Sequence, residues 1–270
     1  MEKTMFLPAL VIIIAIVVYV HQSGGLVTNR NTSSSASNWG GTSEIAGRSD
    51  DQNSSPYSSR AGISEVMNPG SVASAEYVNI YVSSGSTPID ITGWSLESDI
   101  TGSRAVIGTA SPLPGRKDAD RIVLTKESRL YLISGSSPSF GSFQLNRCTG
   151  YFNNSGRYIP EIPFSCPNPL DNIPETLEDN DEDCVDFIQS LDTCELPRQS
   201  LVGRLSSACR AYINSAASYD ACVDTHAQES NFYSNNWHVY LGSRGILWKE
   251  KHDTIRLLDR EGRTIDVYTY

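Results

Sequence analysis

The chain has 270 residues, a formal net charge of −10 and 39% hydrophobic residues. This length allows one large domain or two modest ones. The acidic balance excludes a basic field over the whole chain of the kind that binds nucleic acid. The 20 glycines and 13 prolines interrupt the sequence too often for a long helical bundle.

The N-terminus carries an uncharged apolar segment at residues 5–20, preceded by Lys3. A membrane-spanning helix needs about 20 apolar residues, so residues 5–22 are predicted to be an uncleaved transmembrane signal-anchor. A cleaved signal peptide is the alternative, although no A-x-A cleavage site follows the segment. Lys3 favours a cytoplasmic N-terminus at residues 1–4, with the bulk of the chain outside. The predicted localisation is therefore a single-pass membrane protein exposed at the cell surface.

Residues 23–61 are rich in Ser, Asn and Gly and have no apolar period of 2 or 3.6. Such a composition cannot bury enough apolar surface to offset the entropy of ordering. We predict a disordered linker here.

Short strand-like segments follow the linker. Residues 77–82 alternate in polarity with period 2, which indicates a half-buried strand, and Gly262 lies in a predicted hairpin loop near the C-terminus. Further short strands are predicted at residues 89–91, 94–96, 121–124, 130–133, 237–241, 254–259 and 263–268. Many short strands separated by turns are typical of a sandwich or a barrel.

Three segments resemble the lamin tail domain: EYVNI at Glu76–Ile80, IDITGWSL at Ile89–Leu96 and DTIRLLDREGRTIDVYTY at Asp253–Tyr270. This family occurs at the tail of nuclear lamins and in bacterial surface and secreted proteins. The resemblance implies a mainly β, immunoglobulin-like β-sandwich formed by residues 62–145 and 232–270.

Residues 146–231 lie outside the resemblance and are predicted to be an insertion. They carry 5 basic and 14 acidic side chains, a net charge of −9, and contain all six cysteines. Apolar residues recur at helical spacing in three stretches, which start near Cys184, Leu201 and Tyr219. We therefore expect a helical subdomain.

The six cysteines are predicted to form three disulfides, because exported chains meet oxidising conditions. Fifteen pairings are possible. We favour a local bond and two nested bonds, with free buried cysteines as the alternative, and the absence of C-x2–4-C spacing argues against zinc. The expected pairs are Cys148–Cys166, Cys184–Cys222 and Cys194–Cys209.

An acidic segment at Asp179–Asp183 has the D-x-D-x-D opening of a calcium loop. The sixth and twelfth positions are Cys184 and Ser190 instead of the Gly and Glu that an EF-hand needs. We interpret the segment as an acidic loop that leads into a helix N-terminus, with weak calcium binding as the alternative.

The sequence contains no recognisable catalytic motif. None of the four histidines, His21, His226, His238 and His252, lies beside a nucleophile motif, and no G-x-S-x-G, P-loop, H-E-x-x-H or G-x-G-x-x-G occurs. We therefore predict no enzymatic activity, no catalytic residue and no cofactor.

Two loose basic stretches run from Arg104 to Arg129 and from Lys249 to Arg263, and acidic neighbours dilute both. We interpret them as solvated sheet faces, with an anionic-polymer or nucleic-acid patch as the less favoured alternative. The expected function is a membrane-anchored extracytoplasmic binding or adhesion module with a protein or envelope-polymer partner. The alternatives are a self-associating structural envelope protein and a surface nucleic-acid-binding protein.

Overall fold

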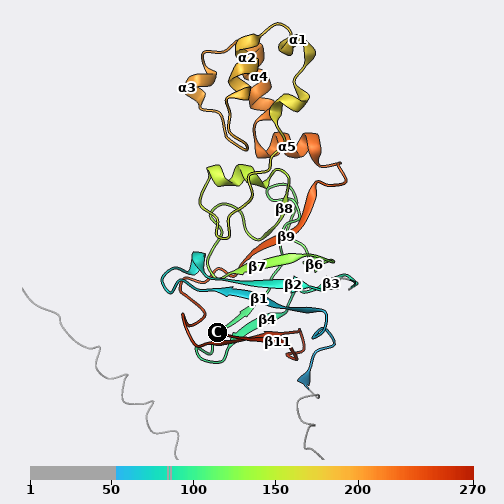
Figure 1. The fold of residues 1–270 in the computed structure, drawn as a ribbon, viewed down its shortest axis with the longest axis vertical. Helices are drawn as coiled ribbons and strands as arrows, with labels where there is room; N and C mark the ends of the chain where they lie inside the picture. Colours follow the sequence, from blue (N-terminus) through green and yellow to red (C-terminus); the bar gives the residue numbers. More distant parts are fainter. Residues whose placement is uncertain (1–52, 84, 86) are drawn as a thin grey trace, which may run out of the picture. The chain divides into compact units, whose positions relative to one another are not determined.

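The computed structural model describes residues 53–83, 85 and 87–270 (Figure 1). None of the helices in this part of the chain is long and apolar enough to cross a membrane. The expected anchor at residues 5–22 lies outside the described residues. We therefore correct the predicted localisation and do not carry the single-pass membrane protein further.

The described strands form three sheets. The five-stranded sheet has the order β1-β2-β7-β9-β8, the four-stranded sheet has the order β11-β10-β4-β5, and β3 pairs with β6. The strands span β1 Ala61–Met67, β2 Tyr77–Val82, β3 Ile89–Asp90, β4 Ser95–Ser98, β5 Arg104–Val106, β6 Val123–Leu124, β7 Arg129–Ile133, β8 Phe143–Asn146, β9 Tyr233–Tyr240, β10 Thr254–Leu258 and β11 Thr264–Thr269.

A common hydrophobic core joins the two larger sheets in a sandwich-like arrangement. Ile80 and Leu132 come from the five-stranded sheet, Leu96 and Leu257 come from the four-stranded sheet, and all four are fully buried with Trp94 in one cluster. The predicted β-sheets are thus confirmed, and each predicted strand coincides with an observed strand or part of one. Strands β1, β5 and β8 were not predicted.

The predicted fold class, an immunoglobulin-like sandwich preceded by a transmembrane helix, is wrong. The five-stranded sheet is mixed, because β7 and β9 run parallel while its other pairs are antiparallel. Parallel neighbours need a long crossover connection. Here residues 134–232 supply it, so β8 and the helical segment belong to the connection that puts β9 in its place (Figure 1).

The insertion is helical, as expected, but its helices are short. The helix predicted near Leu201 is split, because α3 ends before Gly203 and Ser206 begins α4 as an N-cap that accepts from the Cys209 amide. The segments are η2 Ala73–Ala75 before the insertion and then η3 Thr149–Asn154, η4 Pro169–Asn172, α1 Glu175–Glu178, α2 Glu182–Gln189, α3 Gln199–Val202, α4 Ser207–Ala216 and α5 Tyr219–His226.

All six cysteines are paired, which confirms three disulfides, but none of the expected pairs occurs. The bonds are Cys148–Cys222, Cys166–Cys194 and Cys184–Cys209, with Cα–Cα distances of 5.8, 5.3 and 5.6 Å. Helices α2 and α4 share one hydrophobic cluster, so Cys184 meets Cys209 there. Helix α5 instead contacts η3 at the end of β8, and Cys222 therefore meets Cys148.

The folded sandwich includes residues before the predicted domain start at residue 62. The Ser55 amide donates to the Thr264 carbonyl of β11 at 2.8 Å. The ring of Tyr57 packs against Trp94 with a centroid separation of 5.1 Å. Tyr57 covers the core tryptophan, so the end of the predicted linker belongs to the folded sandwich. The rest of the linker lies outside the described residues.

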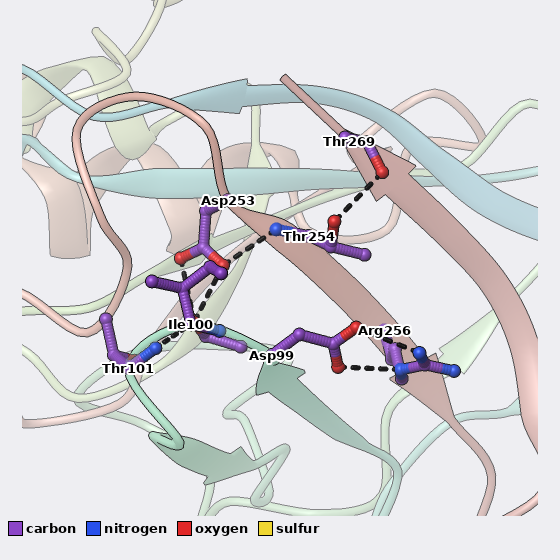
Figure 2. Close-up of polar contacts among 8 residues, drawn as sticks. Asp99, Ile100, Thr101, Asp253, Thr254, Arg256 and Thr269 are labelled. Carbon is purple, nitrogen blue, oxygen red and sulfur yellow. Dashed lines mark hydrogen bonds and ion pairs between the residues drawn. The ribbon is translucent and has the colours of Figure 1, made fainter.

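Three buried carboxylates, Glu76, Asp253 and Asp259, hold the loops that join these strands. Asp253 accepts from the Ser98 hydroxyl at 2.7 and 2.8 Å and from the amides of Lys249 and Thr254 at 2.9 and 2.7 Å. Figure 2 shows it beside Thr254 at the start of β10. A buried charge is tolerated only when donors of this kind surround it.

Replacing Asp253 by Asn is expected to lower the free energy of unfolding by about 2–3 kcal/mol. The side-chain NH2 group of Asn would face the hydroxyl and amide donors that now bind the carboxylate, and those donors would lose an acceptor. Urea unfolding measures this loss. The matched control is Asp99→Asn, which removes the partly exposed pair with Arg256 seen in Figure 2 and should cost at most about 1 kcal/mol. Equal losses in the two variants would contradict the structural role of Asp253.

Gly150 lies under the Cys166–Cys194 disulfide and has no room for a side chain. A Cβ atom there would overlap Cys194 Sγ and lie 3.0 Å from both Cys166 Sγ and the Pro163 carbonyl oxygen. We expect Gly150→Ala to destabilise the protein by about 1–3 kcal/mol, measured by thermal unfolding. Gly141→Ala, at an exposed position with no atom within 4 Å, is the control and should leave the melting temperature almost unchanged.

Candidate functional site

An open groove of about 660 Å³ lies over strands β1, β2 and β7 and the turn before β7. Its volume is in the range of small-molecule binding sites. Its lining residues include Ser64, Glu65, Asn79, Tyr81, Val82, Glu127 and Arg129, which combine polar groups with apolar surface. We call this feature the β1–β2–β7 groove.

The strand register brings these side chains together. Asn79 lies opposite Tyr131 and Tyr81 lies opposite Arg129 in the β2–β7 pair. Because side chains alternate along a strand, Asn79 and Tyr81 face the groove while Ile80 points into the core. In the β1–β2 pair, the register shifts between Ile63 and Glu65. Such a bulge re-aims the side chains beside it, and here Ser64 and Glu65 line the groove.

Asn79 is one of seven described residues with a buried side-chain polar atom that lacks a hydrogen-bond partner. It is 7% exposed, lines the groove, and its Oδ1 has no hydrogen-bond partner among the described residues. Most buried side-chain polar atoms are paired, and an unpaired one costs about 1–3 kcal/mol. The oxygen itself has almost no exposed surface, so it is unpaired inside the protein and does not present itself to the groove.

The other groove residues combine both charges with an exposed aromatic ring. Tyr81 is 40% exposed, and its ring lies against Gly62 on β1. Glu65 is close to the Tyr77 hydroxyl, and burial, followed by the Glu65 charge, raises the pKa of Tyr77. Arg129 is exposed on β7.

Glu127, at the groove rim, has a backbone φ of 64°. This left-handed conformation costs a non-glycine residue about 1–2 kcal/mol. It lies in the turn closed by the Ser128 amide and the Thr125 carbonyl at 3.1 Å, and its carboxylate pairs with Lys126 at 3.3 Å. Both partners of this pair are well exposed, so the pair gives little stability in return.

An aromatic ladder crosses the same sheet beside the groove. Tyr77, Tyr131, His238 and Phe143 follow one another on β2, β7, β9 and β8, with neighbouring centroids 5.4–5.8 Å apart. His238 is 1% exposed, and burial lowers its pKa to about 4. The ladder therefore holds a neutral imidazole at ordinary pH.

The acidic segment at Asp179–Asp183 is structurally engaged at Asp181. Its Oδ1 accepts from the Cys184 amide at 3.1 Å, and its Oδ2 accepts from the Ser206 hydroxyl at 2.5 Å. Asp181 thus caps α2 and joins it to the start of α4. Cys184 and Cys209 lie beside it, but their sulfurs are in a disulfide and cannot serve as thiolate ligands for a metal.

The basic stretches contribute arginines to intramolecular ion pairs instead of one open patch. Arg256, Arg260 and Arg263 pair with Asp99, Asp90 and Asp259 respectively. Arg116 of the first stretch reaches Asp220 and Asp224 on α5. These pairs lower the local positive charge that a polyanion would need.

The histidines do not converge on one site. His226 contacts Glu229 at 2.5 Å, His238 belongs to the aromatic ladder, and His252 lies in the loop before Asp253. His21 lies outside the described residues.

The sequence predicted the alternation at Tyr77, Asn79 and Tyr81 but not the groove, because the groove residues come from separate strands. Scans against protein-family models, curated proteins and solved structures find no match for this chain.

His238 predicts a pH-dependent stability. The unfolded chain takes up a proton near pH 6.5, whereas the folded protein resists it down to about pH 4. Stability from the neutral imidazole is therefore present above about pH 6.5 and is lost as the pH falls toward about 4, by roughly 3 kcal/mol in total. Urea unfolding at several pH values measures this loss. In His238→Phe the slope between pH 6.5 and 4.5 should become shallower, and parallel curves for the two proteins would contradict the assignment.

Proposed function

We propose that this protein is an extracellular, non-catalytic binding module that holds its ligand in the β1–β2–β7 groove. The single observation that carries the proposal is an open groove of ligand size that brings the exposed Tyr81 ring together with the charged side chains of Glu65, Glu127 and Arg129. A site that is ready for a ligand presents a few placed polar groups in a concavity. The side chains of this groove meet that description.

Three disulfides support an oxidising, extracellular setting, because intracellular chains of ordinary organisms rarely keep them. The lamin-tail resemblance is part of the same proposal. Its motif residues include Glu76, Asp253 and Asp259, which are the three buried loop-fixing carboxylates. In this view the motif preserves loop geometry, and the binding groove is a separate feature of this chain.

The composition of the groove favours binding over chemistry. The Ser64 hydroxyl donates to the main-chain carbonyl oxygen of Asn79 at 3.2 Å. The lining contains no histidine or cysteine that could act with this serine as a base or nucleophile. Two carboxylates, Glu65 and Glu127, face one arginine, Arg129. This balance disfavours nucleic acid, whose phosphates need a net positive surface.

Filling the groove tests the proposal. Ser64 is exposed at the bulge, so Ser64→Trp occupies the groove without burying the new ring in the core. The labelled full chain should be retained on cell-envelope fragments from the source organism, and Ser64→Trp should reduce this retention about tenfold. Ser59→Trp, on an exposed turn outside the groove lining, is the matched control and should bind like the original protein. Equal retention of all three proteins would contradict the groove as the binding site.

A further inference from the structure

We propose that one end of the sandwich is a docking surface for an anionic lipid bilayer. This surface, which we call the loop face, consists of the β1–β2 loop at residues 67–76, the β4–β5 turn at residues 99–103 and the β9–β10 loop at residues 241–253. The contact is peripheral, because side chains enter the headgroup boundary and no segment crosses the bilayer. The loop face shares no residue with the β1–β2–β7 groove and adds a second surface to the function proposed above.

Hydrogen bonds hold the three loops together at this end (Figure 1). The Thr101 hydroxyl of the β4–β5 turn donates to the Leu247 carbonyl at 2.8 Å. The Asn68 side-chain amide of the β1–β2 loop donates to the Trp248 carbonyl at 2.7 Å. The buried carboxylates of Glu76 and Asp253 fix the same loops through backbone amides. The loop face therefore has a defined shape before any partner binds.

Large aliphatic side chains are exposed on all three loops. Met67, Val72, Ile100 and Ile246 are 42%, 50%, 56% and 44% exposed. They are four of the twelve exposed large apolar side chains of the described chain, so three short segments hold a third of that surface. Figure 2 shows Ile100 in the turn beside Asp253. Because the loops are fixed, these side chains stay in water until a partner covers them, and a concentration of this kind marks an interaction surface.

The exposed charge of the loop face is positive. Three exposed cations take part in none of the ion pairs found in the described chain: Arg244, Lys249 and Lys251. Glu250 is exposed beside them, whereas Asp99 is paired with Arg256 at 2.7 Å. The whole chain has a net charge of −10, so the loop face has the opposite sign to the protein that carries it.

Aliphatic tips beside unpaired lysines fit a lipid surface better than a protein or a nucleic acid. At a bilayer, aliphatic side chains enter the boundary between headgroups and acyl chains, while lysine stems lie along it and the ammonium groups reach the lipid phosphates. Protein–protein interfaces are depleted in lysine and enriched in aromatic side chains and arginine. Nucleic acid would pair with the cations but leave the apolar tips uncovered. An anionic bilayer matches both features.

Fluorescence quenching by vesicles tests the contact at a single position of the full chain. Ile246→Trp places a reporter on the loop face, and Val106→Trp is the matched control. Val106 is 58% exposed and pairs with Ser95, at the end of the β4–β5 pair away from the turn. The vesicles contain equal parts of phosphatidylcholine and phosphatidylglycerol with brominated acyl chains, and the emission of the four native tryptophans is subtracted.

We expect the tryptophan introduced at position 246 to lose about half of its emission, because interfacial contacts bury side chains about 5–10 Å into the boundary. The tryptophan introduced at position 106 should keep its emission. Vesicles of brominated phosphatidylcholine alone should quench position 246 at least about fivefold less. Both variants change exposed residues and should keep the melting temperature of the original protein.

Charge reversal in the Ile246→Trp background tests the role of the cations. Lys249→Glu together with Lys251→Glu should reduce the quenching by anionic vesicles at least about fivefold. The matched control is Lys117→Glu together with Lys126→Glu, which makes the same charge change at exposed positions outside the loop face and should alter the quenching less than about twofold. Ile100→Ser should reduce the quenching about tenfold, since it removes a neighbouring apolar tip.

The outcomes separate this proposal from the binding groove. Equal quenching at positions 246 and 106, or none at position 246, overturns the lipid contact. Equal quenching with and without phosphatidylglycerol overturns the anionic assignment. If position 246 is not quenched but Ile100→Ser lowers retention on cell-envelope fragments, the loop face binds a protein and the lipid proposal fails. Ser64→Trp should leave the quenching unchanged, so a failure of the groove and a failure of the loop face are observed separately.

Discussion

The sandwich depends on negative charge placed inside it and matched by backbone amides. Glu76 accepts from the amides of Leu247 and Trp248 at 2.7 and 3.0 Å, and Asp259 accepts from the amides of Glu261 and Arg263 at 3.1 and 2.8 Å. Each carboxylate would be costly in the core without those donors. The loops are thus held in a conformation that points their N–H groups inward. This conformation also fixes the position of the strands on either side. Such hydrogen-bond networks act cooperatively, and a partly satisfied network destabilises the core.

The sandwich also anchors the helical insertion at its base. Cys148 directly follows β8, and Cys222 lies on α5 shortly before β9, so their disulfide closes the neck of the insertion. Arg116 adds an ionic contact from the sandwich to α5. Beyond the neck, α2 and α4 keep a separate small cluster with the Cys184–Cys209 bond at its centre. A cluster of that size gains much of its stability from the covalent link.

The sequence predicts the strands well because their signal is local. Period-2 alternation identified β2, and the turn around Gly262 identified the β10–β11 hairpin. Strand β1 was missed because the bulge at Ser64 breaks its alternation. The periodicity of a segment does not specify which strand or cysteine it pairs with. Neither the parallel β7–β9 pair nor the cysteine pairing could therefore be predicted from it. The groove was hidden for the same reason, since Glu65, Asn79 and Arg129 meet only through register.

Local departures from relaxed geometry point to the same groove. Three non-glycine residues in the described part of the chain have a left-handed backbone: Glu127, Cys194 and His252. Cys194 is fixed by its disulfide, and His252 immediately precedes the buried Asp253, so both have a structural reason. Glu127 is held by the turn that the Ser128 amide and the Thr125 carbonyl close, and its side chain adds only an exposed pair with Lys126. The bulge at Ser64 and this turn place their side chains around one groove. Sequences break local rules mainly where function requires it, and this coincidence supports the groove as the candidate site.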